Sequence, residues 1–235
     1  MADKLTQTFT IQKWSALRDR LSNKTLLTDD WKDAIKLLKE RVYERYFNPL
    51  KILIDNSENK GEGFTILTIE CALVEFLATL EDGRIFKRNK LPTDKHCYYR
   101  RSAKIYQKFL RTTAIFDRYF YSSTGEKPLF TPYDFYLNVR CALIHEAQTR
   151  EKWEVKIYKT NEQDKVNEIC FDQTSDGKKL VYRTALYKKL VEYFNSFVTT
   201  QLTQENDRGK TLRKHLARKI DHLAEVNPDK KFWWD

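Results

Sequence analysis

The chain has 235 residues, of which 41% are hydrophobic and 14% aromatic, and its formal net charge is +10. This length and composition suit a folded protein with a sizeable core and exclude an intrinsically disordered chain. The sequence shows no secretion-signal pattern and no apolar run near the roughly 18 residues of a membrane span, so we expect a cytoplasmic protein that does not associate with membranes.

The four cysteines, Cys71, Cys97, Cys141 and Cys170, stand singly with no C-x-x-C pair. Cys71 and Cys141 lie in apolar helical patterns and are expected to be core thiols. This usage fits a reducing compartment and argues against a zinc site. We therefore expect neither a metal nor a cofactor.

The N-terminal part, residues 1–55, predicts helices. The first spans about Thr10 to Leu21. Thr28 begins the second, because its side chain can cap the helix and the two acids after it suit the helix dipole. The apolar positions of this helix continue to Tyr46. Pro49 should kink or end it, with a further turn over residues 50–54.

Residues 56–63 (NSENKGEG) form the first clear break and predict a loop between packed helices. The most apolar helix follows, from Phe64 to Leu80, and Gly83 stands at its C-cap. Because this helix is apolar nearly all round, it should be central in the fold. Glu70 and Glu75 interrupt it, and each either faces solvent at a helix edge or pairs with a buried cation.

The positive charge is concentrated between Arg84 and Arg111, where ten lysines and arginines meet one acid, Asp94. A long helix is predicted from Cys97 to Tyr121. Aromatic residues between the charges suit single-stranded nucleic acid, whose phosphates meet cations while its bases stack on rings. The alternative is a solvated helix face whose aromatics point into the core. The candidate RNA-binding residues are Arg84, Lys87, Arg88, Arg100, Arg101, Lys104, Lys108 and Arg111.

The stretch from Thr131 to Arg150 predicts a helix that Thr131 caps, with proline at its first position. At about 100° per residue, Arg140 falls near the middle of an apolar arc. A buried guanidinium is costly unless it is paired or lines a polar pocket. His145 lies about 140° further round, at the edge of the arc. The apolar residues expected around Arg140 are Tyr136, Leu137, Val139, Leu143 and Ile144.

The sequence after this helix changes to a period of two and predicts a small antiparallel sheet over residues 152–182, with a turn at Asp176 and Gly177. A helix from residue 184 onward should break at residues 206–209, before a last basic helix at 211–223. His215 and His222 share a face of that helix, where a surface pair is favoured over a metal site. The tail with Phe232, Trp233 and Trp234 should dock on the domain or on a partner.

Arg140 and His145, with four residues between them, resemble the Arg-x4-6-His signature of HEPN domains (higher eukaryote and prokaryote nucleotide-binding). The resemblance covers roughly residues 63–202. It implies a mainly α, HEPN-like helical bundle in which the small antiparallel β-sheet is inserted after the motif helix. The whole chain, 1–235, would then be a single domain, with N-terminal helices at 1–55 and a basic helix and aromatic tail at 207–235.

Many HEPN proteins are metal-independent endoribonucleases of toxin, abortive-infection and CRISPR-associated antiviral systems. The resemblance therefore implies RNA as substrate, with Arg140 and His145 as catalytic residues. It also implies a homodimer whose 131–150 helices face each other, and an antitoxin or other defence-system partner. Polar support would come from Glu70 or Glu75, and from Cys141, which stands where HEPN nucleases often have Asn or another polar residue. The alternative is a non-catalytic HEPN module that binds nucleotide, RNA or a partner protein.

Overall fold

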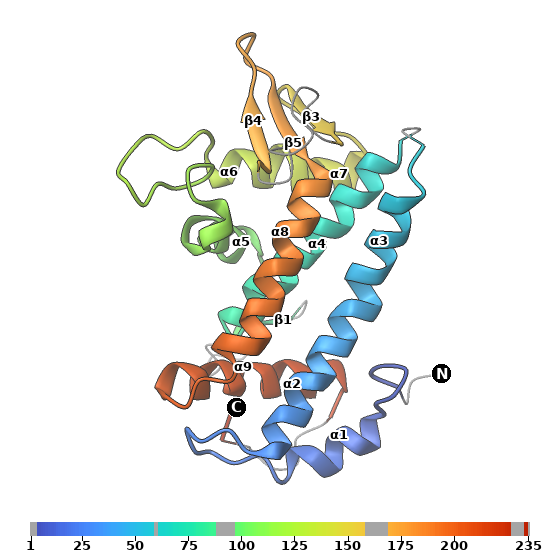
Figure 1. Ribbon diagram of the computed structural model, residues 1–235, viewed down its shortest axis with the longest axis vertical. Coiled ribbons are helices and arrows are strands. Elements are labelled where there is room, and N and C mark those ends of the chain that lie inside the picture. Colours follow the sequence, from blue (N-terminus) through green and yellow to red (C-terminus); the bar gives the residue numbers. More distant parts are fainter. Residues whose placement is uncertain (1–3, 59–60, 88–96, 158–168, 227–232, 235) are drawn as a thin grey trace. The chain divides into compact units, whose positions relative to one another are not determined.

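The computed structural model describes residues 4–58, 61–87, 97–157, 169–226 and 233–234. The chain is mainly α with a small sheet after the motif helix, as the sequence predicts, and it has a second, two-stranded sheet that was not predicted (Figure 1). It divides into two compact units, each assembled from separate segments. The first unit comprises residues 1–47, 79–100 and 194–235, and the second comprises residues 48–78 and 101–193. The single-domain organisation stays a prediction.

In the first unit, the helices begin at polar side chains that accept backbone N–H groups. Thr10 caps α1 (Ile11–Arg18), and Thr28 caps α2 (Asp29–Val42), as predicted. Asn206 caps α9 (Asp207–Leu223) through the N–H of Gly209 at 2.9 Å. The predicted break at 206–209 is therefore the start of the last helix.

One carboxylate, Asp221 on α9, links helix α1 and the C-terminal Trp234 to α9. It accepts hydrogen bonds from Trp14 Nε1 at 2.7 Å, from Arg18 Nη2 at 2.6 Å and from Trp234 Nε1 at 2.8 Å. Trp234 is fully buried. The C-terminal aromatic tail thus docks on its own chain, one of the two alternatives predicted. Phe232 lies outside the described residues.

The helix does not end at Pro49, and the further turn predicted over residues 50–54 is present. The chain passes without a break from α2 through the wide π turn η1 (Tyr43–Phe47) into α3 (Asn48–Asp55). A proline clashes with the carbonyl one turn earlier and lacks an N–H donor, and a widened turn accommodates both defects. The helix therefore continues through Pro49.

Most of α4 (Glu62–Glu81) belongs to the second unit, and its last residues belong to the first. The helix ends as predicted at Gly83, whose φ is +66°. By length and composition α4 is the one helix among the described residues that could cross a membrane. Of its apolar 18-residue stretch, 56% is buried inside the protein. Mostly buried apolar helices of this length occur in the cores of water-soluble folds, which matches the predicted central position.

The predicted long helix at 97–121 is wrong. Its start is the strand β2 (Tyr98–Tyr99), which pairs in parallel with β1 (Ile85–Phe86). The helical part is α5 (Ala103–Thr112), followed by the short 3-10 turn η2 (Ala114–Phe116). Thr113 separates them with an extended backbone.

The larger sheet contains β3 (Trp153–Lys156), β4 (Phe171–Gln173) and β5 (Lys179–Tyr182) in the order β3-β5-β4. Only β4 and β5 are antiparallel, joined by the predicted turn, where Gly177 has a φ of +81°. β3 pairs with β5 in parallel, so the antiparallel sheet was predicted correctly only in part. Helix α8 (Arg183–Ser196) follows directly and ends in the π turn η4 (Phe197–Gln201).

Candidate functional site

The motif helix consists of α6 (Pro132–Phe135), the π turn η3 (Tyr136–Cys141) and α7 (Ala142–Glu146), without a break. Thr131 caps it as predicted, accepting the N–H of Asp134 at 3.1 Å. It ends before the predicted Arg150, because Ala147 adopts the left-handed conformation with φ +54°. Its wide central turn, which contains Arg140, was not predicted. Such turns are frequent at functional sites.

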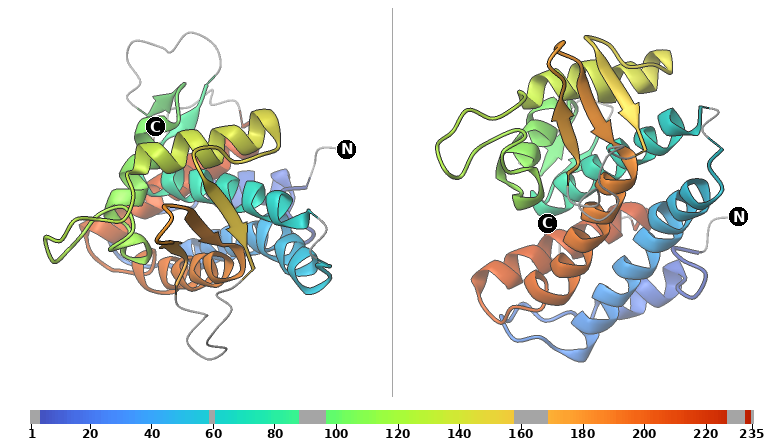
Figure 2. Two further views of the ribbon diagram at one scale, coloured as in Figure 1. Left: turned by 90° about the horizontal axis from the view of Figure 1, so that it is seen from above. Right: turned by 45° about the horizontal axis from the view of Figure 1, so that its top comes forward.

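A single aspartate ties the motif helix to the larger sheet of the second unit, which lies beside it in Figures 1 and 2. Asp134 accepts hydrogen bonds from Asn138 Nδ2 at 2.8 Å, Trp153 Nε1 at 3.0 Å and Lys179 Nζ at 2.9 Å. The sheet therefore supports the first half of the helix.

Arg140 is paired with Glu75 of α4. The distance from Arg140 Nη2 to Glu75 Oε2 is 2.5 Å, and the two side chains are 17% and 19% exposed. Burial opposes the charge of Arg140, but the carboxylate outweighs burial and the pKa of the guanidinium is raised. Of the two glutamates proposed from the sequence, Glu75 is the partner of Arg140.

Glu70 does not pair with Arg140. It is fully buried, and both its carboxyl oxygens lack a hydrogen-bond partner within the described part of the chain. Burial raises the pKa of this carboxyl well above its usual value, and the nearby Arg183 only partly opposes that shift. Glu70 therefore neither pairs with Arg140 nor faces solvent at a helix edge, the two alternatives predicted for it.

Two further side chains hold Arg140 from its own helix. The ring of Tyr136, one turn earlier, lies 5.5 Å from the guanidinium carbon, within cation–π range. The Sγ of Cys141 lies 4.0 Å from Arg140 Nη1, and Cys141 is half-buried. Tyr136 is in turn hydrogen-bonded to Ser102 at 3.1 Å between the two hydroxyl oxygens. Arg140 is therefore contacted by groups on two elements, α4 and η3, and Ser102 supports the Tyr136 ring.

An apolar wall lies behind this cluster. Tyr106 of α5 and Cys71 of α4 are both buried, and burial raises the pKa of the Cys71 thiol to about 12. The thiol therefore stays protonated, as expected for a core cysteine. Only Cys71 fits the prediction of a fully buried core thiol, because Cys141 is partly accessible beside Arg140.

His145 lies in α7 and is exposed. No hydrogen bond or ion pair to another described residue holds its ring. It follows Arg140 by five residues on one helix, so the guanidinium is fixed by its partners while the imidazole is open to solvent. This arrangement can bind a phosphate at Arg140 and transfer a proton at His145.

The apolar arc predicted around Arg140 is divided between core and surface. Val139 and Leu143 are buried, whereas Leu137 is 38% exposed and Ile144 is 44% exposed. Tyr133, one turn before Leu137, is 56% exposed. These three side chains, which we call the exposed stripe, run along the motif helix on either side of Arg140. Large exposed apolar side chains in a row often mark a contact surface.

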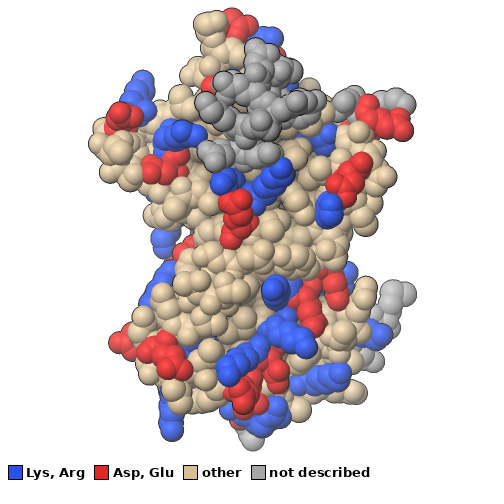
Figure 3. Space-filling model, in the orientation of Figure 1, with Lys and Arg blue, Asp and Glu red and all other residues tan. Residues whose placement is uncertain are grey.

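The proposed RNA-binding residues lie on both units. Arg84, Lys87 and Arg100 belong to the first unit, and Arg88 lies outside the described residues. In the second unit, Arg101 and the α5 residues Lys104, Lys108 and Arg111 are exposed. On the face in view in Figure 3, basic side chains are interspersed with acidic ones and form no continuous basic surface.

The aromatic residues of the basic segment separate into two groups. Tyr106 and Phe109 are buried in the core, so on α5 the alternative prediction of a solvated basic face with inward aromatics is correct. Tyr98 and Tyr99 are half-buried in β2, and Lys87 Nζ lies 4.4 Å from the centre of the Tyr98 ring. Among the described residues of the basic segment, accessible aromatic rings therefore lie in the β1–β2 region.

Of the two histidines on α9, His222 is exposed as predicted, whereas His215 is half-buried. His215 Nδ1 lies 2.9 Å from the carbonyl oxygen of Glu81, and burial lowers the pKa of this histidine to about 4. Within the described residues, no group of three or more His, Cys, Asp or Glu side chains could hold a metal ion. His96 lies outside the described residues.

Comparison of the chain with family models, curated proteins and solved structures finds no match. The site must therefore be interpreted from its own residues. Sequence reasoning placed Tyr136 beside Arg140, but only as an apolar neighbour, and it missed Ser102. The spacing of four residues between Tyr136 and Arg140 was a usable signal, because such pairs are neighbours on a helix. Ser102 had no comparable signal.

Proposed function

We propose that this protein is a metal-independent endoribonuclease with a HEPN-like helical bundle and an inserted small sheet. The observation that carries the proposal is a partly buried arginine, held by Glu75, on the same helix as the exposed His145. A toxin or antiviral-defence effector in the cytoplasm is the setting that the resemblance of its motif to HEPN signatures suggests.

The chemistry uses the nucleophile that RNA itself supplies. The 2′-hydroxyl attacks the adjacent phosphorus, and the bond to the 5′-oxygen breaks, giving a 2′,3′-cyclic phosphate and a free 5′-hydroxyl. His145 removes the 2′ proton or protonates the leaving oxygen, a role typically worth about 10²–10⁴-fold in rate. Arg140 binds the phosphate and stabilises the negative charge that develops on it.

A two-fold dimer would complete this site. A single His145 cannot act as acid and base in one step, whereas two facing motif helices supply a second histidine and a second arginine. The exposed stripe supports this contact, because a second copy would cover Tyr133, Leu137 and Ile144. Glu75 on each chain reduces the repulsion between the two arginines.

The decisive experiment incubates labelled single-stranded RNA with the purified protein and with its Arg140→Ala and His145→Ala variants. Cleavage by the wild type alone, with a 2′,3′-cyclic phosphate end, supports the proposal. EDTA should leave the rate unchanged. Equal cleavage by either variant, or loss of activity on chelation that Mg²⁺ restores, contradicts it.

A second candidate is a non-catalytic module that binds nucleotide, RNA or a protein of a defence complex. The observation that favours it is Cys141, whose thiol lies beside Arg140 where a stronger hydrogen-bonding side chain would better orient a phosphate. In that case RNA binds without being cut, and Arg140→Ala weakens binding.

A further inference from the structure

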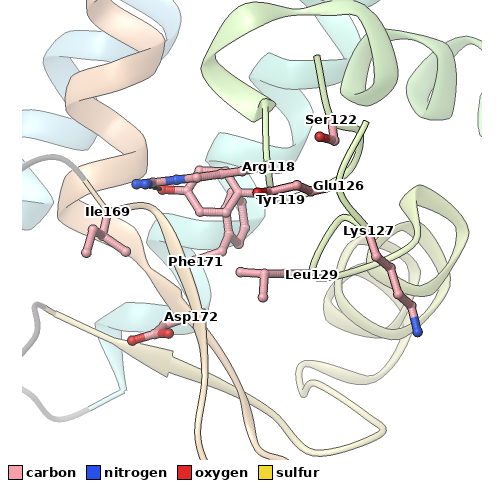
Figure 4. A pocket seen from close by; sticks show the side chains of 9 residues that line it. All are labelled: Arg118, Tyr119, Ser122, Glu126, Lys127, Leu129, Ile169, Phe171 and Asp172. Carbon is pink, nitrogen blue, oxygen red and sulfur yellow. Dashed lines mark hydrogen bonds between the residues drawn. The ribbon is translucent and has the colours of Figure 1, made fainter. Parts of the chain in front are cut away.

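A hollow of about 300 Å³ lies in the second unit, away from the residues of the Arg140 cluster (Figure 4). One wall is the loop from Arg118 to Leu129, and the other is the strand β4 with Ile169 before it. Its volume is at the lower end of the range for ligand pockets. None of its lining residues takes part in the proposed nuclease mechanism.

The β4 wall is the edge of a strand. Phe171 and Asp172 are consecutive and point to opposite faces of the sheet, yet both line the hollow. β4 is also the outer strand of the sheet in the described part of the chain. Since Tyr182 N–H donates to Cys170 O at 2.9 Å, the alternation of an antiparallel ladder directs the N–H and C=O of Phe171 away from β5. Main-chain groups therefore face the hollow.

The loop wall is held in a strained conformation. Arg118 has a φ of +61°, which is uncommon for a residue with a side chain. The Asp117 carboxylate fixes this turn by accepting the N–H of Arg118 at 2.8 Å and of Ser123 at 3.0 Å. The end of the loop is hydrogen-bonded to its start, since Leu129 N–H donates to Arg118 O at 3.1 Å. Strained residues that their surroundings over-determine cluster at binding sites.

The floor is apolar and the rim carries both charges. The rings of Tyr119 and Phe171 lie 5.1 Å apart beneath the hollow, and Leu129, which is 44% exposed, projects between the two walls in Figure 4. Two basic side chains and two acidic ones line the rim: Arg118, Lys127, Glu126 and Asp172.

A second hollow of about 390 Å³ continues on the other side of Arg118 and Tyr119, which line both. It also carries charges of both signs, from Lys189, Asp117 and Glu192. Together the two hollows form a groove lined by four acids and three bases. Such a lining disfavours a polyanion, because nucleic-acid sites concentrate positive charge.

We propose that this groove binds an extended peptide of a partner protein, which adds to the edge of β4 that no described strand pairs with. Strand addition at a sheet edge derives affinity from main-chain hydrogen bonds and specificity from pockets for alternate side chains. The peptide places one large apolar side chain, such as Leu or Phe, over Tyr119, Phe171 and Leu129. Lysine and glutamate on either side of it pair with the acids and bases of the rim. This peptide site is independent of the ribonuclease proposal.

The test uses the full chain and fluorescein-labelled synthetic peptides with a central Leu or Phe between Lys and Glu in a Val/Thr host. A matched peptide is N-methylated at the central residue, which removes a main-chain donor. Leu129→Glu is the pocket variant, and Leu26→Glu, at a leucine 54% exposed in the first unit, is the control. We expect saturable peptide binding. Its affinity should fall about tenfold or more with Leu129→Glu or with the N-methylated peptide, and Leu26→Glu should leave it unchanged.

Circular dichroism and thermal melting establish that both variants are folded. A further variant, Lys127→Glu, reverses one charge of the rim and should change which flanking residue of the peptide, Lys or Glu, is preferred. Absence of saturable binding, or binding that N-methylation and Leu129→Glu do not change, overturns the peptide site. The peptide site is also overturned if the protein binds single-stranded RNA and Leu129→Glu, but not Leu26→Glu, abolishes that binding. The groove would then be a nucleic-acid site. RNA cleavage should be equal in wild type and Leu129→Glu, so failure of either proposal is seen separately.

Discussion

The guanidinium of Arg140 and the carboxylate of Glu75 meet at 2.5 Å although the two residues are 65 positions apart in the sequence. The pair fixes the cation of the motif helix to the central helix of the second unit. Because both side chains are mostly buried, removal of one partner leaves the other poorly solvated. The orientation of Arg140 therefore depends on Glu75.

Glu75→Gln should lower RNA cleavage by up to about 100-fold, because a misplaced catalytic group can cost that much. The amide keeps the shape of the side chain but not its charge, so stability should fall by only about 1–3 kcal/mol. Single-turnover cleavage rates and urea denaturation measure the two effects. Glu70→Gln, on the same helix, is the matched control and should cleave normally. Equal rates in both variants would show that Glu75 does not orient Arg140.

Glu70→Gln has its own expected effect, on stability. Burial raises the pKa of the Glu70 carboxyl in the folded chain, so the folded state holds this proton more tightly than the unfolded state. That contribution to stability is fully present below the unfolded pKa of about 4.3 and is lost as pH rises through the folded pKa. The glutamine variant should therefore be more stable than wild type at neutral pH, with the difference shrinking in acid. Urea midpoints that keep a constant difference across pH would contradict this.

Sequence reasoning predicted most of the local structure around the site. Thr131 as a cap, the apolar character of α4 and a glutamate partner for Arg140 all follow from residue chemistry and spacing. The choice between Glu70 and Glu75 did not, because it depends on how α4 packs against the motif helix. The π turns were equally hidden. η3 contains no proline or glycine that would mark it, and tertiary packing selects such turns.

The sheet shows a second kind of limit. The alternating residues from Trp153 onward predicted strands, but alternation does not specify the neighbour of a strand. The short turn at Gly177 joins β4 and β5 as an antiparallel hairpin, and this pair was predicted. β3 pairs in parallel with β5, a direction that the alternation of residues 153–156 does not specify.

Charge reversal of Arg100 and Arg101 should weaken RNA binding and flatten its salt dependence. Both side chains are exposed, so the change should not disturb the core. For single strands, removing one cation from a phosphate lowers the slope of log K against log salt by about 0.7. Fluorescence anisotropy at several salt concentrations measures this slope. The same slope in wild type and variant would mean that these residues form only a solvated surface.

Gly83→Ala should destabilise the first unit. Gly83 has a φ of +66°, and a Cβ there would overlap the ring of His215, which is held by the Glu81 carbonyl. We expect a loss of about 1–3 kcal/mol from backbone strain, with further loss from displacement of the ring. Gly125→Ala is the control, since its φ is +84° but no atom lies within 4 Å of the added Cβ. Equal unfolding free energies for the two variants would exclude a role for the His215 contact.

The exposed stripe provides the test of the composite dimer. Leu137→Asp and Ile144→Asp together should leave the fold intact, because these side chains are 38% and 44% exposed. Under the dimer proposal they place charge in a two-fold contact, where each aspartate also meets its own copy. We expect a monomer in sedimentation and loss of RNA cleavage, whereas Leu26→Asp in the first unit should change neither.

Complementation then asks whether the two chains share one site. Arg140→Ala and His145→Ala proteins, each inactive, are mixed under conditions that let subunits exchange. A heterodimer pools one arginine and one histidine from different chains in a single cleft, so part of the activity should return. The exposed His145 can reach across the contact because no described residue holds its ring, whereas Arg140 stays fixed by the Glu75 of its own chain. If the mixture stays inactive, or the wild type cleaves fully as a monomer at assay concentration, each chain must carry a complete site of its own.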